Sequence, residues 1–318
     1  MKTAAGALSH DALFYEDERT LQETAVEFVR VGVERGEQVL VSTSGNPATS
    51  LLRALFADKR RVRFSDGALF ERPVDRVGHY RRIMDQGRAH GMPGFRTTGL
   101  IDLEASELPW QEWIRYEAAV TRLFAGYPFT TLCVYDSRRL SPEQHAGLLG
   151  AHQGLLGPDG RHDNPEYVEP EDLVSRPVLA LPDDPLQSAP PAIEIDDVPD
   201  VGSMRDAVFP AAFGTGLSAK TVDDFVRALG ELVANGRTHG VPPVTLRMWV
   251  AADRLLATVT DTGPGCDDPF LGYLPTHSCR DGNDATAGLG LWAARMLCSV
   301  VDYGRTDEGF TVRVSSFA

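Results

Sequence analysis

The stretch Glu231-Leu-Val-Ala-Asn-Gly-Arg-Thr-His239 ends a long amphipathic pattern and sets polar side chains at helical spacing. Glu231, Asn235 and His239 follow one another at four-residue intervals, so on a helix they lie along one face. Just upstream, apolar residues recur at the spacing of one buried stripe. The sequence therefore predicts a core-facing helix with a polar row beside its apolar stripe. The stripe consists of Val222, Phe225, Val226, Leu229, Leu232 and Val233.

The polar row allows two interpretations. A carboxylate and a carboxamide on adjacent turns can hold Mg²⁺, which prefers oxygen ligands, and Glu231 can accept a proton from an attacking hydroxyl or water. The same Glu-x-x-x-Asn pattern is also found on ordinary solvated helix faces. Motifs further along the chain decide between the two.

Composition indicates two globular domains, because the 318 residues are 42% hydrophobic and 24% charged. The net charge of -14 disfavours direct nucleic-acid binding through phosphate neutralisation. No apolar run is long enough for a signal peptide or a membrane span, so we expect a cytoplasmic protein that does not enter a membrane. The cysteines have neither CxxC pairing nor zinc-site spacing, which predicts reduced, buried thiols. They are Cys133, Cys266, Cys279 and Cys298.

In the first half of the chain, short apolar runs alternate with helical patterns. This alternation predicts a mostly parallel sheet covered by helices on both faces, over roughly residues 10–155. The loop 42–47 follows a strand and precedes a helix, the position of a phosphate-binding loop in nucleotide-binding α/β domains. The loop lacks the Gly-Lys-Ser/Thr ending of such loops, so we expect no nucleotide here. The expected strands are 13–15, 39–41, 62–64, 95–101 and 129–136, and the expected helices are 18–35, one from near 47, 74–88 and 109–124.

Three motifs of this half resemble the MEDS sensory domains, which are relatives of the RecA-like ATPase fold. They are His10-x-x-x-Phe14-Tyr15-x-Asp17, Gly36-Glu37-x-Val39-Leu40 and Cys133-x-Tyr135-Asp136. The resemblance implies a RecA-like parallel α/β domain over residues 8–156 that senses a small molecule or a partner. The nearby aromatic residues either line a ligand pocket or pack the core; they are Trp110, Trp113 and Tyr116.

Residues 157–192 are dense in Pro and Asp and show no sustained period, which predicts a linker. The domain boundary then falls near 185–195, and Ile193-Glu-Ile195 can begin the second domain as an edge strand.

A hairpin and a glycine-rich turn follow the predicted helix. Apolar alternation over 244–250 and 255–259 predicts the hairpin. Asp261 continues the second alternation, so its carboxylate should point into the layer between sheet and helices, where it needs a partner. It can accept the exocyclic amine of adenine, and Gly263 and Gly265 let the backbone approach a flat base. A plain Gly-Pro turn is the other interpretation.

A second glycine motif, Gly288-Leu289-Gly290, opens the next helical pattern. Backbone N–H groups at such a helix start can cradle a phosphate. The irregular stretch 266–287 before it is longer than an ordinary connection, as expected of a lid over a ligand. Residues 309–314 are typical of a closing strand.

Taken in order, three motifs resemble the N, G1 and G2 boxes of the GHKL (Bergerat-fold) ATPases, and among these the anti-sigma-factor serine kinases. They are Glu231-Leu-Val-x-Asn235-x-x-x-His239-Gly240, Asp261-Thr-Gly-Pro-Gly265 and Gly288-Leu289-Gly290. The resemblance implies an α/β sandwich over residues 193–318, with helices on one face of a mixed sheet. It also implies ATP and Mg²⁺ as cofactors.

The same resemblance assigns roles to individual residues. Asn235 would hold Mg²⁺ and Glu231 would activate the accepting serine hydroxyl, while Asp261 and Thr311 would bind adenine. With the MEDS-like half in front, the chain resembles sensor-coupled anti-sigma-factor regulators. The resemblance implies two partners, a sigma factor and an anti-sigma-factor antagonist. It also implies that the chain itself forms a homodimer. The other residues assigned to the nucleotide site are His239, Gly263, Gly265, Gly288, Leu289 and Gly290.

One departure from the pattern leaves two functions open. The place before Gly288, often basic in anti-sigma kinases, is Ala285-Thr-Ala287, and the nearest cation is Arg280. Losing a charge there weakens phosphoryl transfer more than ATP binding. The chain is then either a protein serine kinase that phosphorylates the antagonist or a non-catalytic, ATP-dependent module that binds a sigma factor. A histidine kinase is disfavoured, because a Pro- and Asp-rich segment stands where its phospho-accepting helical hairpin would be.

Overall fold

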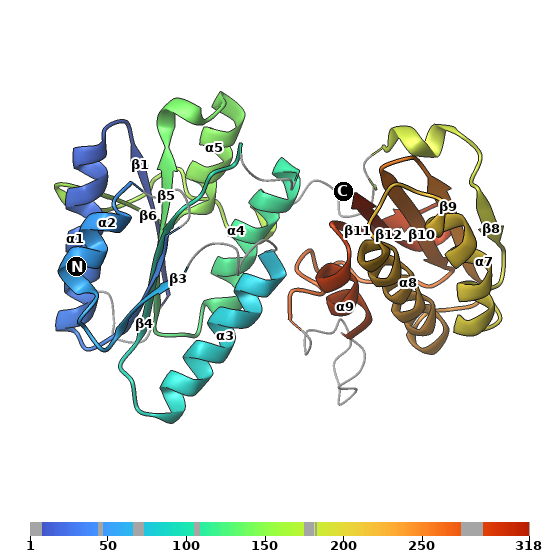
Figure 1. Ribbon diagram of the computed structural model, residues 1–318, viewed down its shortest axis with the longest axis horizontal. Coiled ribbons are helices and arrows are strands. Elements are labelled where there is room, and N and C mark those ends of the chain that lie inside the picture. Colours follow the sequence, from blue (N-terminus) through green and yellow to red (C-terminus); the bar gives the residue numbers. More distant parts are fainter. Residues whose placement is uncertain are drawn as a thin grey trace. The chain divides into compact units, whose positions relative to one another are not determined.

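The computed structural model describes residues 8–43, 47–65, 73–104, 109–174, 181, 183–274 and 289–317. The chain folds into two compact units, Met1–Val174 and Ser175–Ala318 (Figure 1).

The first unit is built on a seven-stranded sheet in the order β3-β2-β4-β5-β1-β6-β7. Every neighbouring pair is parallel except β6 and β7, which are antiparallel. The predicted, mostly parallel sheet is therefore confirmed. Its strands are β1 (Ser9–Tyr15), β2 (Gln38–Ser42), β3 (Val62–Ser65), β4 (Phe95–Leu100), β5 (Phe129–Asp136), β6 (Gly154–Gly157) and β7 (Gly160–Asp163).

Helices cover both faces of this sheet, with α1 and α2 on one side and α3, α4 and α5 on the other (Figure 1). Side-chain caps fix where two of them begin: Asp17 accepts from the backbone N–H of Thr20, and Ser141 and Gln144 form a capping box. The bounds are α1 (Glu18–Glu34), α2 (Thr49–Phe56), α3 (Pro73–Ala89), α4 (Trp110–Phe124), α5 (Pro142–Ala151) and α6 (Pro170–Leu173).

The sequence predicts a linker over residues 157–192, whereas the division between the two units lies between Val174 and Ser175. The first unit includes the hairpin of β6 and β7 and the short helix α6. The 3-10 turn Pro185–Ser188 packs on the second unit. Next to this turn, Trp249 Nε1 donates to the Ala189 carbonyl at 2.8 Å. Strand β7 is hard to recognise in the sequence because Arg161-His162-Asp163 is polar throughout. Pairing with β6 decides its conformation.

The second unit holds a five-stranded sheet in the order β11-β12-β10-β9-β8. Every neighbouring pair is antiparallel, so the mixed sheet implied by the resemblance is wrong. The predicted hairpin is confirmed as β9 and β10, and the predicted edge strand as β8. The bounds are β8 (Ile193–Ile195), β9 (Val244–Val250), β10 (Arg254–Asp261), β11 (Val300–Thr306) and β12 (Gly309–Phe317).

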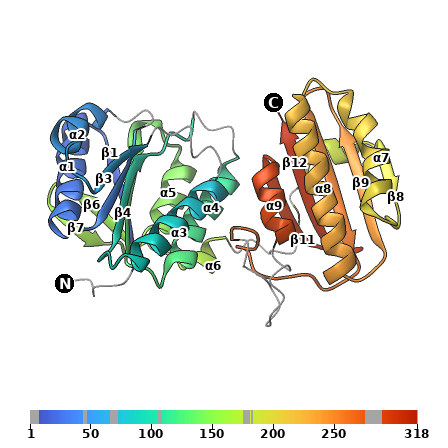
Figure 2. The same cartoon turned by 60° about the horizontal axis from the view of Figure 1, so that its bottom comes forward.

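The helices α7 (Val201–Phe213), α8 (Ala219–His239) and α9 (Leu289–Leu297) lie together on one face of this sheet (Figure 2). Helix α8 begins after Ser218, whose side chain accepts from the backbone N–H of Thr221. Its predicted apolar stripe is buried against β9, β10 and β12 in one hydrophobic core. The polar row beside the stripe stays nearer the surface.

Phe225 tests how far the second unit depends on this stripe, because its side chain is 0% exposed, whereas Phe213 on α7 is 63% exposed. We expect Phe225→Ala to lower the free energy of unfolding by about 3–5 kcal/mol through lost burial and a cavity. Phe213→Ala, the matched control, should change it by less than about 0.5 kcal/mol. Calorimetric unfolding of the full chain measures both, and equal effects of the two variants would contradict the burial of α8.

Candidate nucleotide pocket

A pocket opens at the carboxyl-terminal end of α8, where α8, β10, β12 and α9 meet. Three of the polar groups predicted from the sequence line it, namely Asn235, His239 and Asp261, together with Gly263 and Gly265. The remaining walls are mostly apolar, which suits a flat, partly hydrophobic ligand. They include Leu232, Val241, Val259, Leu271, Leu291, Phe310 and Val312.

Asp261 is fixed at the end of β10 and faces the pocket beside Val259, as its place in the alternation predicts. Its Oδ1 accepts two backbone hydrogen bonds, from Val241 N at 3.0 Å and from Gly263 N at 2.8 Å. The described residues donate no hydrogen bond to Oδ2. One carboxylate oxygen is thus held in place while the other remains for a donor on a ligand.

Gly265 closes the turn after Asp261 with φ +62, a conformation that favours glycine. A Cβ at this position would lie 1.9 Å from the ring of Phe310. The backbone of the glycine-rich turn is therefore packed directly on β12, and this close approach forms one wall of the pocket.

Gly290 brings the start of α9 against the polar row of α8. A Cβ at Gly290 would lie 3.0 Å from Asn235 Cβ and 3.2 Å from the Glu231 carbonyl oxygen, so a larger side chain would push the two helices apart. Leu289 is 38% exposed and does not line the pocket. Gly288, Arg280 and Ala285–Ala287 lie outside the described residues.

The residues of the polar row differ in whether they line the pocket. The Asn235 carboxamide is half-buried in the pocket lining and makes no hydrogen bond to any described residue. Glu231, one turn earlier, is exposed, and its carboxylate has no ion pair within the described part of the chain. The structure thus groups Asn235 and His239 with Asp261, and it leaves Glu231 at the solvent side.

Thr311 does not face this pocket, contrary to its expected role in binding adenine. Its neighbours Phe310 and Val312 line the pocket, and because side chains alternate along a strand, Thr311 points to the other face. There its Oγ1 lies 2.9 Å from that of Thr260 and 3.2 Å from that of Thr306. The motif alone selected Thr311, whereas strand alternation would have selected Phe310.

The cysteines differ in part from the expected set of reduced, buried thiols. Cys133 and Cys298 are buried and are not in a disulfide. Cys266, in the wall of the nucleotide pocket, is disulfide-bonded. The expectation of reduced thiols is therefore wrong for Cys266.

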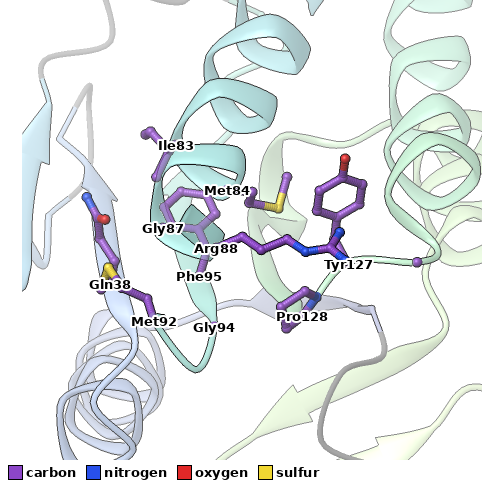
Figure 3. Close-up of a pocket in the computed structure, with 11 residues that line it drawn as sticks. Gln38, Ile83, Met84, Gly87, Arg88, Met92, Gly94, Phe95, Tyr127 and Pro128 are labelled. Atoms are coloured by element: carbon purple, nitrogen blue, oxygen red, sulfur yellow. The ribbon is translucent and has the colours of Figure 1, made fainter. Parts of the chain in front are cut away.

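The first unit has pockets at both ends of its strands. Figure 3 shows one at the amino-terminal ends of β2, β4 and β5, where Met84 and Arg88 of α3 face Phe95 and Tyr127. Parallel sheets usually bind ligands at the opposite, carboxyl-terminal edge. A small pocket does lie toward that edge, and its lining includes Ser42, Arg76, Gly99, Tyr116 and Cys133.

The aromatic cluster on α4 serves this second pocket only in part. Tyr116 lines it, whereas Trp110 and Trp113 do not. Trp113 and Tyr116 instead hold the guanidinium of Arg76, whose carbon lies 5.3 Å and 5.9 Å from their ring centroids. Packing against a cation therefore explains most of the aromatic spacing seen in the sequence.

Comparisons with known proteins separate the two halves. Residues 9–153 match the family model of MEDS, the methanogen/methylotroph, DcmR sensory domain, and residues 196–316 match that of the histidine kinase-like ATPase domain. No curated protein matches the chain. Among solved structures, the cytoplasmic domain of EssC is similar at 12% identity with a TM-score of 0.31, over 58% of this chain and 39% of that one.

Within the described residues, no helix is long and apolar enough to cross a membrane. The two matched segments lie one in each compact unit. The chain therefore carries a MEDS sensory domain followed by a histidine kinase-like ATPase domain.

Proposed function

We propose that the second unit binds ATP with Mg²⁺ and transfers the terminal phosphoryl group to a serine of an anti-sigma-factor antagonist, under control of the MEDS domain. The observation that carries the proposal is the convergence of two unengaged polar groups, Asp261 Oδ2 and the Asn235 carboxamide, in one largely apolar pocket. Histidine kinase-like ATPase domains in general use ATP and Mg²⁺, and these groups fit both.

Asp261 forms the base-binding end of the proposed site. Two backbone N–H groups orient its carboxylate, so Oδ2 is preorganised to accept an exocyclic amine. Val259 and Phe310 supply apolar surface for the adenine ring, and the turn at Gly265 lets the backbone approach it.

Asn235 forms the metal-binding end. Its carboxamide oxygen supplies one ligand of the kind that Mg²⁺ prefers, and this ion usually takes its other ligands from phosphates and water. Bound Mg²⁺·ATP supplies the phosphoryl group and neutralises the charge that develops on it. The packing of Gly290 on Asn235 fixes the start of α9 beside this end of the pocket.

The proposed role of Glu231 is to act on a protein substrate rather than on the nucleotide. Its exposed carboxylate lies one helical turn from Asn235, where the serine of a docked antagonist can reach it. The Glu231 carboxylate would take the hydroxyl proton as the serine oxygen bonds to the terminal phosphorus, and the phosphorus–oxygen bond to the leaving ADP would break.

A second function is favoured by one specific observation. No basic residue stands at positions 285–287, directly before Gly288. A site that binds ATP without this charge suits a module whose nucleotide-dependent shape holds a sigma factor without turnover. Both functions need Asn235 and Asp261, but only the kinase needs Glu231.

Asp261→Asn tests the base-binding end. Replacing Oδ2 by an amide nitrogen should weaken ATP binding about 10- to 100-fold, because a hydrogen bond to a charged group is lost. Thr311→Val is the matched control on the other sheet face and should leave the dissociation constant within about twofold. Titration calorimetry with a non-hydrolysable ATP analogue and Mg²⁺ measures both. A loss of affinity in Thr311→Val alone would overturn the proposed orientation of β12.

Glu231→Gln separates chemistry from binding. We expect ATP affinity to stay unchanged and phosphoryl transfer to fall at least about 100-fold, the usual size of a general-base contribution. The assay combines labelled ATP with antagonist proteins encoded in the same genome, and Asn235→Ala should lose both binding and transfer. If the wild type binds ATP, transfers nothing, and changes its affinity for a sigma factor when ATP is added, the kinase proposal fails and the binding module stands.

A further inference from the structure

Four metal-ligating side chains converge inside the first unit, apart from the nucleotide pocket. His10 lies on β1, Glu117 on α4, Cys133 on β5, and His152 directly follows α5. Their donor atoms all lie within 4.8 Å of one another. Cys133 is 8% exposed and the other three are 0% exposed. Segments far apart in the sequence therefore bring two imidazoles, a thiol and a carboxylate to one point.

Four of the six separations between these donor atoms are close to those of tetrahedral coordination of one ion. Ligand atoms at about 2.0–2.3 Å from a tetrahedral Zn²⁺ ion lie about 3.3–3.6 Å from each other. Here His10 Nε2 lies 3.2 Å from Glu117 Oε2 and 3.5 Å from Cys133 Sγ. Glu117 Oε2 lies 3.6 Å from Cys133 Sγ and 3.7 Å from His152 Nε2.

His152 presents a buried, unsatisfied ring nitrogen to the cluster. Its Nδ1 lies 2.6 Å from the Leu148 carbonyl oxygen, which only accepts, so Nδ1 carries the proton and Nε2 carries a lone pair. The buried Nε2 has no hydrogen-bond partner and faces an oxygen of Glu117, another acceptor. A positive ion between them satisfies both.

The other ligands are also held from outside the cluster. His10 Nδ1 lies 2.8 Å from the Thr121 hydroxyl oxygen, and the Tyr135 hydroxyl donates to Glu117 Oε1 at 2.9 Å. Such contacts leave His10 Nε2 and Glu117 Oε2 pointing inward. Metal-binding histidines and carboxylates are typically oriented in this way.

A purely structural hydrogen-bond network explains the cluster less well. In that case His10 Nε2 donates to Glu117, and the cluster is a buried ion pair or a neutral hydrogen bond. This arrangement accounts for Glu117, which lies against His10 Nε2 and accepts from the Tyr135 hydroxyl. It leaves the lone pair of His152 without a donor and gives Cys133 no role.

We propose that His10, Glu117, Cys133 and His152 bind one divalent transition-metal ion of the Zn²⁺ class in the sensory domain. Imidazole and thiolate ligands select such ions over Mg²⁺ and Ca²⁺. On binding, the Cys133 thiol releases its proton to solvent and the thiolate sulfur ligates the ion. The two negative ligands then balance the two positive charges of the ion, so the buried site is neutral overall and avoids a large desolvation cost.

A small pocket adjoins the cluster. Cys133 is in its lining, together with Tyr80, Thr97 and Thr131, whereas His10, Glu117 and His152 are not. Cys133 is thus the one residue of the four that borders this pocket.

The test loads the metal-free full chain with Co²⁺, a coloured substitute for Zn²⁺. We expect about one ion per chain, the strong visible bands of tetrahedral Co²⁺, and a thiolate-to-metal charge-transfer band in the ultraviolet. Zn²⁺ should bleach these bands, and excess Mg²⁺ should not. A wild-type spectrum without the charge-transfer band, or binding of fewer than about 0.1 ions per chain, overturns the proposal.

Variants assign the ligands. Cys133→Ser should remove the charge-transfer band, whereas Cys298→Ser, the matched control at the other buried cysteine that is not in a disulfide, should keep it. His152→Ala should weaken Co²⁺ binding at least about 100-fold, and Tyr135→Phe about 10-fold, because it loses only an orienting contact. Circular dichroism verifies that each variant is folded. A band that survives in folded Cys133→Ser excludes this site, and the wild-type spectrum decides the question if a variant does not fold.

Discussion

The candidate nucleotide pocket depends on which faces of α8 are apolar and which are polar. The apolar stripe of this helix fixes it against β9, β10 and β12, and the polar row on the adjacent face is thereby presented at the level of Asp261. The two faces of α8 cannot move independently. If the helix turned about its axis by one residue position, Asn235 would be buried and part of the apolar stripe would be exposed. Gly290 adds a second constraint, since a Cβ at this position would lie 3.0 Å from Asn235 Cβ, which leaves little room between α9 and α8.

Local patterns predict most of the fold but not its long-range choices. The alternation of Val244–Val250 with Leu255–Asp261 predicts the hairpin, and the stripe from Val222 to Val233 predicts α8. The pairings of β10 with β12 and of β8 with β9 join segments distant in sequence, so local patterns do not give their direction. Strand β7 pairs with its sequence neighbour β6, but its polar residues give no strand pattern. Thr311 shows the limit of motif reasoning, because a motif gives a position whereas strand alternation gives the face.

The same limit explains why the buried cluster of the first unit is not evident from the sequence. His10, Glu117, Cys133 and His152 show no metal-binding spacing along the chain. They meet only because β1 and β5 are adjacent parallel strands and α4 and the end of α5 cover the same face. Two of the motifs that resemble MEDS domains contain His10 and Cys133, so the resemblance identifies these positions without revealing that they touch.

The two sites differ in what their polar groups require. In the ATPase domain, Asp261 Oδ2 and Asn235 line an open pocket, where water satisfies them until a ligand arrives. In the sensory domain, His152 Nε2 is wholly enclosed, and water cannot substitute for a missing partner without space and further polar contacts. An unpaired acceptor beside a carboxylate has a free-energy cost even when the domain is idle. The proposed resident ion removes that cost, which would make the cluster part of the folded domain's stability, whereas the candidate nucleotide pocket stays satisfied by water without a ligand.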